Sequence, residues 1–239
     1  MKQLTVLANL IDGINFVDSS NFMINEIKWL FGFSPKQPRE VLFIPYGYTD
    51  SFYHTYFQNI EDLFSQAGCG VISISDGDPI EMIQNANAFA IGGGDIAALL
   101  TGLNNLRTSA FDPFDEIHNK IIKGTPYIGW NEGSEIASPI PFGPPMPGIA
   151  SCLNVFQHQL ICNYVDSSSN RSEIKNFLID QTPSIEKVVC MSNSPGGSGI
   201  RLEDDGSGMI LDPGGGGGTW PPMQVFSLYN GGLLENNTL

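Results

Sequence analysis

Positively charged residues are scarce in this chain. Lys and Arg account for 11 of its 239 residues, against 25 Asp and Glu, so the formal net charge is −14. Such an acidic surface repels phosphate backbones and anionic lipid headgroups. We therefore expect neither a nucleic-acid partner nor a membrane-surface partner. Charged residues make up only 15% of the chain, compared with about 25% in a typical globular protein.

Cysteine pairs and long apolar runs are also lacking. The cysteines are Cys69, Cys152, Cys162 and Cys190. They show no CxxC pattern or short repeated spacing, which predicts neither a disulfide framework nor a zinc site. No run reaches the roughly 18 apolar residues of a membrane helix, and Asn9 and Asp12 interrupt the N-terminal apolar stretch, which favours a strand over a signal peptide. We expect a soluble, cytoplasmic protein that uses no metal or cofactor.

Over the first two thirds of the chain, short apolar stretches alternate with amphipathic ones. The expected strands cover 3–9, 40–45, 71–75, 87–91 and 126–129. The expected helices cover 20–31, 51–66, a short segment opened by Asp78-Pro79, 96–103 and 112–122. Because the strands are continuous apolar runs, the pattern predicts a mostly parallel sheet with helices on both faces. The sequence therefore indicates a doubly wound α/β fold.

The composition changes after residue 138. Residues 139–148 contain five prolines and cannot form a regular helix. A helix is expected over 171–180, and the segments KVVCM, GIRLE, GMILD and MQVFSLY beyond residue 186 predict antiparallel strands. We expect these strands to extend a single domain spanning residues 1–239. The run Gly214–Gly218 lacks the Lys or Ser of a phosphate loop, so it predicts a flexible connection.

Two of the expected strands end in glycine-rich turns, IGGGD over 91–95 and IGWNEGSE over 128–135. Ligands of doubly wound sheets bind beyond the carboxyl ends of the strands. The second turn, a strand followed by Gly-x-x-x-Gly and a helix, has the outline of a nucleophile elbow. The raised position in such an elbow is normally Ser or Cys, and here it is Asn131.

The sequence resembles the peptidase E family of aspartyl dipeptidases. The relatives of this family include cyanophycinase, and the family has the class I glutamine amidotransferase-like fold. The matching stretches are VLFIPYG (41–47), AFAIGGGDIAALL (88–100), PYIGWNEGSEIASP (126–139) and LNVFQHQLICNY (153–164). In the family these are a strand ending in Ile-Pro, a Val-Gly-Gly-Gly-Asn turn, a Gly-Trp-Ser-Ala-Gly elbow and a strand ending in Asn-Pro-His. The resemblance covers roughly residues 1–210 and implies serine-type hydrolysis of dipeptides with an N-terminal Asp.

The essential positions of that family carry other residues in this chain. The serine nucleophile falls on Asn131, the general-base histidine falls on Asn163, and the acidic residue falls near Pro145. A carboxamide nitrogen is not a nucleophile at neutral pH, and Asn cannot take up and return a proton as imidazole does. Acyl-enzyme chemistry needs both groups. The sequence therefore predicts a pocket that has lost its hydrolytic machinery.

A ligand pocket does not require the nucleophile or the general base. The residues that we expect to line it are Gly92, Gly93, Gly94, Asp95, Trp130, Asn131, Glu132 and Asn163. The resemblance implies that backbone N–H groups of the glycine turn, and the one after position 131, form an oxyanion hole. Alternatively, the glycines form a tight turn with Asp95 as the helix N-cap. Glu132 is either a first-turn helix residue, with Glu135, or an acid or base in other chemistry.

Other residues are weaker candidates for the missing groups. We expect His118 to face solvent, and His54 lies early in a helix near the strand ends. If residues 157–163 form one strand, His158 and Cys162 point to the face opposite Asn163. Arg171 is expected as an exposed residue at the start of a helix, although the resemblance also allows it to recognise an acidic substrate.

Three functions follow from these residues. The first is a pseudo-peptidase that binds a small peptide, an amino-acid derivative or a protein partner in the old active site. The second is an enzyme with non-hydrolytic chemistry of the cyclase, isomerase or lyase type, with Glu132 as its candidate acid or base. The third is an active aspartyl dipeptidase whose nucleophile lies elsewhere in the chain.

Overall fold

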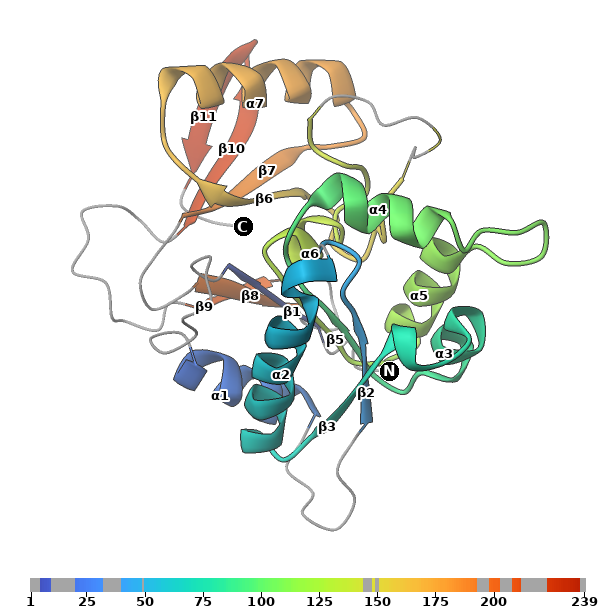
Figure 1. Ribbon diagram of the computed structural model, residues 1–239. Coiled ribbons are helices and arrows are strands. Elements are labelled where there is room, and N and C mark those ends of the chain that lie inside the picture. Colours follow the sequence, from blue (N-terminus) through green and yellow to red (C-terminus); the bar gives the residue numbers. More distant parts are fainter. Residues whose placement is uncertain are drawn as a thin grey trace.

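The computed structural model describes residues 5–9, 20–31, 40–48, 50–143, 148, 151–192, 198–202, 208–211 and 223–236. Over these residues the chain forms two sheets with helices around them (Figure 1). The strands are β1 (Thr5–Asn9), β2 (Glu40–Ile44), β3 (Gly70–Ser73), β4 (Phe89–Ile91), β5 (Tyr127–Trp130), β6 (Gln159–Tyr164), β7 (Lys187–Ser192), β8 (Ser198–Leu202), β9 (Gly208–Leu211), β10 (Met223–Tyr229) and β11 (Gly232–Asn236). The helices are α1 (Ser20–Phe31), α2 (Asp50–Gln66), α3 (Pro79–Asn85), α4 (Ile96–Asn104), α5 (Pro113–Ile122), α6 (Glu132–Glu135) and α7 (Ser168–Gln181).

The larger sheet has the strand order β3-β2-β4-β5-β1-β8-β9. Its first five strands pair in parallel, and β8 and β9 extend it in antiparallel fashion. Strands β4 and β5 are buried along their whole length, and β2 is buried except at its first residue. This is the pattern of a parallel sheet covered on both faces, and it confirms the predicted α/β fold.

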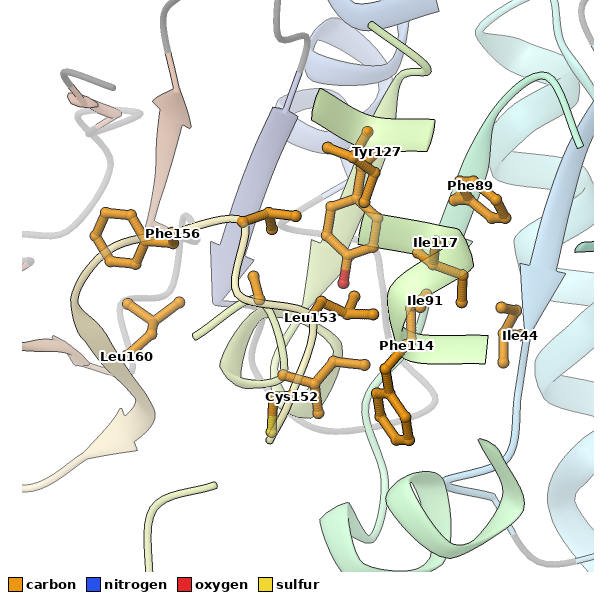
Figure 2. Close-up of a cluster of buried hydrophobic side chains, with 14 of the residues drawn as sticks. Ile44, Phe89, Ile91, Phe114, Ile117, Tyr127, Cys152, Leu153, Phe156 and Leu160 are labelled. Atoms are coloured by element: carbon orange, nitrogen blue, oxygen red, sulfur yellow. The ribbon is translucent and has the colours of Figure 1, made fainter. Parts of the chain in front are cut away.

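Alternate residues of the central strands face opposite sides of the sheet. One side packs under α3, α4 and α5, and its strand residues include Leu42, Ile44, Phe89, Ile91 and Tyr127. Figure 2 shows part of this cluster. The other side packs under α1 and α2, and its strand residues include Val41, Phe43, Ala90, Ile128 and Trp130. The sheet is thereby fixed from both faces, which holds the carboxyl ends of its strands in register.

The predicted C-terminal strands are confirmed, but they divide between two sheets. Strands β8 and β9 lie at the edge of the larger sheet, whereas β7, β10 and β11 join β6 in a second sheet of order β11-β10-β7-β6. In this second sheet β6 and β7 are parallel and the other pairs are antiparallel. Helix α7 packs on it through Ile174 and Leu178, beside Phe226 of β10.

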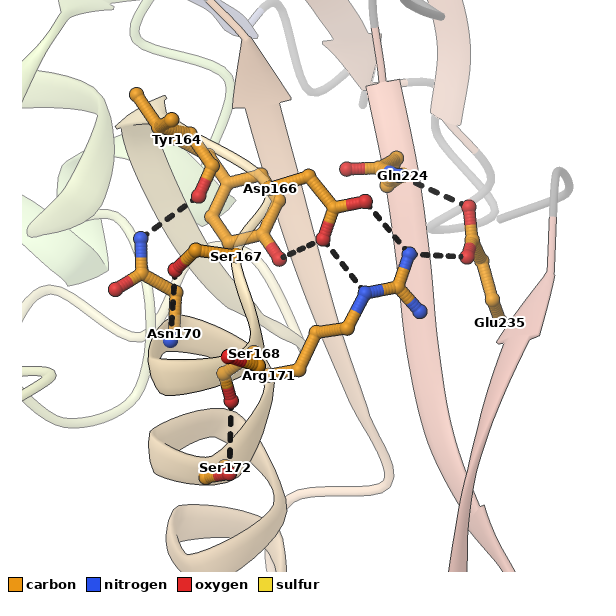
Figure 3. A network of polar contacts seen from close by, with 10 residues as sticks. Tyr164, Asp166, Ser167, Ser168, Asn170, Arg171, Ser172, Gln224 and Glu235 are labelled. Atoms are coloured by element: carbon orange, nitrogen blue, oxygen red, sulfur yellow. Dashed lines mark hydrogen bonds and ion pairs between the residues drawn. The ribbon is translucent and has the colours of Figure 1, made fainter.

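An ion-pair network ties the start of α7 to the second sheet (Figure 3). The Arg171 guanidinium donates to both carboxylate oxygens of Asp166, at 2.6 and 2.7 Å, and to Glu235 Oε2 at 2.8 Å. It also lies over the Phe226 ring, 5.3 Å from the centroid. Bonding to Arg171 lowers the pKa of Asp166. Arg171 was expected as an exposed residue at a helix start; it lies near the start of α7, which begins at Ser168, and it is half-buried with its charge paired to two carboxylates.

Short polar residues set the ends of several elements. The strand expected over 71–75 ends at Ser73, because Ser73 and Asp76 form a capping box around a 3₁₀ turn at Ile74–Asp76. Asp78 and Asp112 cap α3 and α5, each followed by a proline at the first helical position. These local signals explain why the helix starts expected from the sequence lie close to the observed ones.

Two sequence features fall outside the described residues, namely Pro145 and the run Gly214–Gly218. In the part of the chain that is described, no helix is both long enough and apolar enough to cross a bilayer.

Candidate functional site

The turn between β5 and α6 has the backbone shape of a nucleophile elbow. Asn131 has φ 50° and ψ −121°, a conformation that glycine usually takes at the first central position of a type II′ turn. The Asn131 carbonyl then accepts hydrogen bonds from Ser134 N at 2.8 Å and Glu135 N at 3.0 Å. A non-glycine residue in such a conformation costs about 1–3 kcal/mol. The chain thus keeps the strained turn and places a carboxamide at its tip.

Glycines allow three turns to pack backbone against backbone around this tip. A Cβ added at Gly133 would overlap the carbonyl oxygen of Ile91, and one added at Gly94 would overlap that of Gly47. Gly94 also has φ 119°, a region that side chains rarely adopt. The Asp95 amide donates to the Gly47 carbonyl at 2.8 Å. The loop after β2, the glycine turn after β4 and the elbow after β5 therefore form one closely packed unit.

Side chains from the core hold the elbow from below. The Tyr127 hydroxyl donates to the Gly133 carbonyl, and Ser134 Oγ donates to the Gly129 carbonyl at 2.7 Å. Trp130 is only 2% exposed and its Nε1 donates to the Tyr56 hydroxyl at 2.7 Å. Burial raises the pKa of Tyr56 well above its usual value. The Trp130 ring, expected in the pocket lining, packs in the core beneath the elbow.

Glu132 joins the elbow to the glycine turn. Its Oε2 accepts a hydrogen bond from the Gly94 amide at 2.8 Å, across 38 residues of sequence. This carboxylate was expected either to serve the first turn of its own helix or to act as an acid or base; it lies in the first turn of α6 and bonds to the neighbouring glycine turn. Asp95 does act as an N-cap, because its Oδ1 accepts from Ala98 N of α4 at 2.8 Å.

Glu135 and Cys162 join the elbow to β6 of the second sheet. Glu135 Oε1 accepts from the Cys162 amide at 2.7 Å, and the Cys162 thiol donates to the Asn131 carbonyl at 3.2 Å. Burial raises the pKa of Cys162 well above its usual range, and the charges of Glu135 and Glu132 add to this. The thiol is therefore protonated at neutral pH and acts as a hydrogen-bond donor rather than as a nucleophile.

Asn163 follows Cys162 directly, within β6, where the pairing of that strand with β7 is irregular. It has φ 55°, and the pairing of β6 with β7 shifts register between Ile161 and Tyr164. Asn tolerates this left-handed conformation better than most residues. Asn163 also borders a cavity of about 190 Å³, whose lining residues are Phe142, Ile161, Cys162, Asn163, Tyr164, Val165, Asn170, Glu173 and Ile174. The position that matches the family's histidine thus lies one residue from the strand's contacts with the elbow.

The histidines have other surroundings. His54 is exposed and pairs with Gln58 at 3.2 Å within α2. His118 was expected to face solvent, but it is partly buried and its Nδ1 lies 2.8 Å from the Leu153 carbonyl, so it links α5 to the segment before β6. His158 lies just before β6, and burial lowers its pKa. Pro145, the position matched to the family's acid, lies outside the described residues.

Glu135 gives the site a distinctive pH dependence. Burial raises its pKa from 4.5 to about 8, against the lowering effect of the bond from the Cys162 amide. The folded protein holds this proton more tightly than the unfolded chain. Unfolding therefore releases a proton between pH 4.5 and about 8, and the free energy of unfolding falls as pH rises through that window.

We expect the variant Glu135→Gln to remove this part of the pH dependence. The Gln carbonyl can still accept from the Cys162 amide, so the fold is retained. Urea unfolding at pH 5, 6, 7 and 8 would show a shallower decline than in the wild type, by at most about 1.4 kcal/mol per pH unit. Glu61→Gln, at an exposed position of α2, serves as the control. Equal pH slopes in wild type and Glu135→Gln would contradict the assignment.

Two of these contacts had no signal in the sequence. Glu132 and Gly94 lie on different turns, and Glu135 lies in α6 whereas Cys162 lies in β6, so neither pair has a characteristic spacing. The only sequence feature that points to Glu132 and Glu135 is the presence of two carboxylates directly after the elbow tip. The contacts that the structure shows bring Gly93, Gly94, Asn131 and Glu132 into one cluster, with β6 attached through Cys162.

Comparison with known proteins places this geometry in a family. The profile of peptidase family S51 matches residues 17–206. Peptidase E of Nostoc sp. is 28% identical over 193 residues, which cover 77% of this chain and 76% of that protein. Peptidase E of Pasteurella multocida is 25% identical over 179 residues, 67% of this chain and 73% of that protein.

Solved structures share the fold. The crystal structure of a peptidase from an acI-B1 Actinobacterium aligns with a TM-score of 0.63 at 12% identity, covering 98% of this chain and 95% of that one. A putative peptidase E protein from Listeria monocytogenes aligns with a TM-score of 0.53 at 17% identity, covering 87% and 98%. With the profile match extending over most of the sequence, the chain belongs to peptidase family S51.

Proposed function

We propose that this protein is a pseudo-peptidase of family S51, which binds a small peptide or amino-acid derivative where its relatives would carry out hydrolysis. The observation that carries the proposal is Asn131, held at φ 50° and ψ −121° at the elbow tip. The backbone is that of a nucleophile elbow, but the side chain is a carboxamide. Asn163 adds a second amide where the resemblance requires an imidazole.

Among the residues that the structure describes, a thiol and a hydroxyl lie at the elbow, and both have structural roles. The Cys162 thiol contacts the elbow, but burial keeps it protonated. Ser134 Oγ donates to the Gly129 carbonyl inside the core and is fully buried. Both groups have structural partners within the elbow, which supports binding rather than acyl transfer as the function. A protein partner is the larger alternative to a small ligand in the same site.

A specific observation also favours repurposed, non-hydrolytic chemistry as a second candidate. Glu132 and Glu135 stand one helical turn apart at the elbow, and burial raises the pKa of Glu135 to about 8, with the charge of Glu132 adding to this effect. Two carboxyl groups in unlike environments are a common arrangement for an acid and a base. Such an enzyme would consume its substrate without forming an acyl-enzyme, and Glu132→Gln would abolish turnover.

The test of the first proposal is hydrolysis by the purified wild-type protein. Aspartyl-leucine and the chromogenic aspartyl 4-nitroanilide are incubated with it, and an active aspartyl dipeptidase is run in parallel. We expect no release of amino acid or nitroaniline above the buffer blank. Turnover that a serine-directed inhibitor abolishes would contradict the pseudo-peptidase and support an active dipeptidase.

A further inference from the structure

The Glu132 carboxylate lies over the glycine turn. Its Oε2 is 2.8 Å from the Gly94 nitrogen, and a Cβ added at Gly93 would meet the same oxygen at 2.7 Å. That added Cβ would also stand 2.9 Å from the Asn131 Cβ. The carboxylate therefore sits beside the elbow tip, directly above the backbone between positions 93 and 94. The tip itself is covered, because Asn131 is only 3% exposed.

This position is significant because of what the turn's amides can bind. An amide has one hydrogen to donate, and a charged acceptor gives a shorter and stronger bond than a neutral carbonyl. A ligand oxygen that approaches Gly94 must therefore compete with a carboxylate held in place by the chain. In the Gly-Trp-Ser-Ala-Gly elbow of the peptidase E family, which this sequence resembles, Ala stands at the position of Glu132. The methyl group of Ala cannot reach the glycine turn.

We propose that Glu132 is the specificity-determining residue of the site. Its carboxylate already accepts the hydrogen bond of the Gly94 amide, and it thereby excludes the carbonyl or carboxylate oxygen of a ligand from that amide. The inference rests on the proposed function, since it assumes that the elbow and the glycine turn still form a ligand site. It extends that function by naming the group that a peptide ligand must displace.

Neighbouring groups support this placement of negative charge. Glu132 contributes to the raised pKa values of Glu135, Cys162 and Tyr56, which surround the elbow from α6, β6 and α2. Removing the charge leaves the backbone turn intact, because Gly93 and Gly94 are held by packing against Gly47 and Asn131. A shortened side chain at position 132 would thus free an amide that is already in position.

The experiment measures binding of aspartyl-leucine by titration calorimetry to the wild type, Glu132→Ala, Glu132→Gln and the control Glu116→Ala. Circular dichroism checks that each variant is folded. We expect Glu132→Ala to bind at least about tenfold more tightly than the wild type, which corresponds to about 1.4 kcal/mol. Glu132→Gln should lie between them, because its neutral carbonyl can still accept from Gly94 but competes less strongly. Glu116→Ala should bind as the wild type does.

A second readout follows the amide directly. In ¹⁵N–¹H spectra, the Gly94 amide proton should move upfield in Glu132→Ala, and adding aspartyl-leucine should return it downfield. Equal affinities in wild type and Glu132→Ala, or binding to neither, would overturn the role of Glu132. Hydrolysis of the dipeptide by the wild type would instead overturn the proposed function, so the two failures are distinguishable.

Discussion

Replacing Gly133 with alanine is expected to lower the free energy of unfolding by about 3 kcal/mol or more. The added Cβ would overlap the carbonyl oxygen of Ile91 and would come within 3.0 Å of that of Gly92. Both are main-chain atoms at the buried end of β4, so no side chain can rotate away. The bond from the Tyr127 hydroxyl to the Gly133 carbonyl restrains the elbow from the other side.

Urea unfolding followed by far-ultraviolet circular dichroism measures this loss. Gly77→Ala is the matched control, since its Cβ would meet only the flexible Met82 side chain and its φ of −157° suits any residue. We expect the control to change the free energy of unfolding by less than about 1 kcal/mol. A Gly133→Ala protein as stable as the control would show that the elbow is not packed against the glycine turn as described.

Hydrolysis of aspartyl-leucine is expected to appear when three positions are changed together: Asn131→Ser, Asn163→His and Glu132→Ala. The first two supply a nucleophile and a base on backbones whose φ values, 50° and 55°, are already set. The third frees the Gly94 amide for the acyl oxygen. We expect a rate at least about 10²-fold above the buffer blank, the lower end of what a positioned acid–base group contributes.

The comparison that decides this prediction is with the double variant that keeps Glu132. Its carboxylate would still occupy the amide that must stabilise the developing oxyanion, so its rate should stay close to that of the wild type. Equal activity in the double and triple variants would show that Glu132 does not control the site. A folded triple variant without activity would show that the surviving backbone geometry no longer supports acyl transfer.

Much of the fold could be predicted from local patterns. Continuous apolar runs at β2, β4 and β5 indicated a parallel sheet covered on both faces, and the structure has those strands buried. Asp78 marked the start of a helix because it precedes a proline at the first helical position, and the helix expected from residue 112 begins at Pro113. The elbow was visible as a Gly-x-x-x-Gly turn between a strand and a helix.

Long-range arrangement was harder to predict. The second sheet pairs β6 with β7, which lies beyond the whole of α7 in the sequence, and the apolar pattern of β6 does not specify which sheet it joins. His118 was misplaced because helical periodicity does not show that the segment containing Leu153 folds over α5. The bonds of Glu132 and Glu135 were missed for the same reason, since first-turn carboxylates usually serve their own helix.

The central claim is that no reactive hydroxyl or thiol operates at the elbow of this S51 protein, and covalent labelling tests it most directly. The wild-type protein is incubated with a fluorophosphonate probe and its intact mass is measured, with an active serine peptidase as the positive control. The account predicts that the mass of the protein stays unchanged while the control gains one probe adduct. A stoichiometric adduct that maps by peptide sequencing to Ser134, Cys162 or any other residue, with loss of an associated dipeptidase activity, would contradict it.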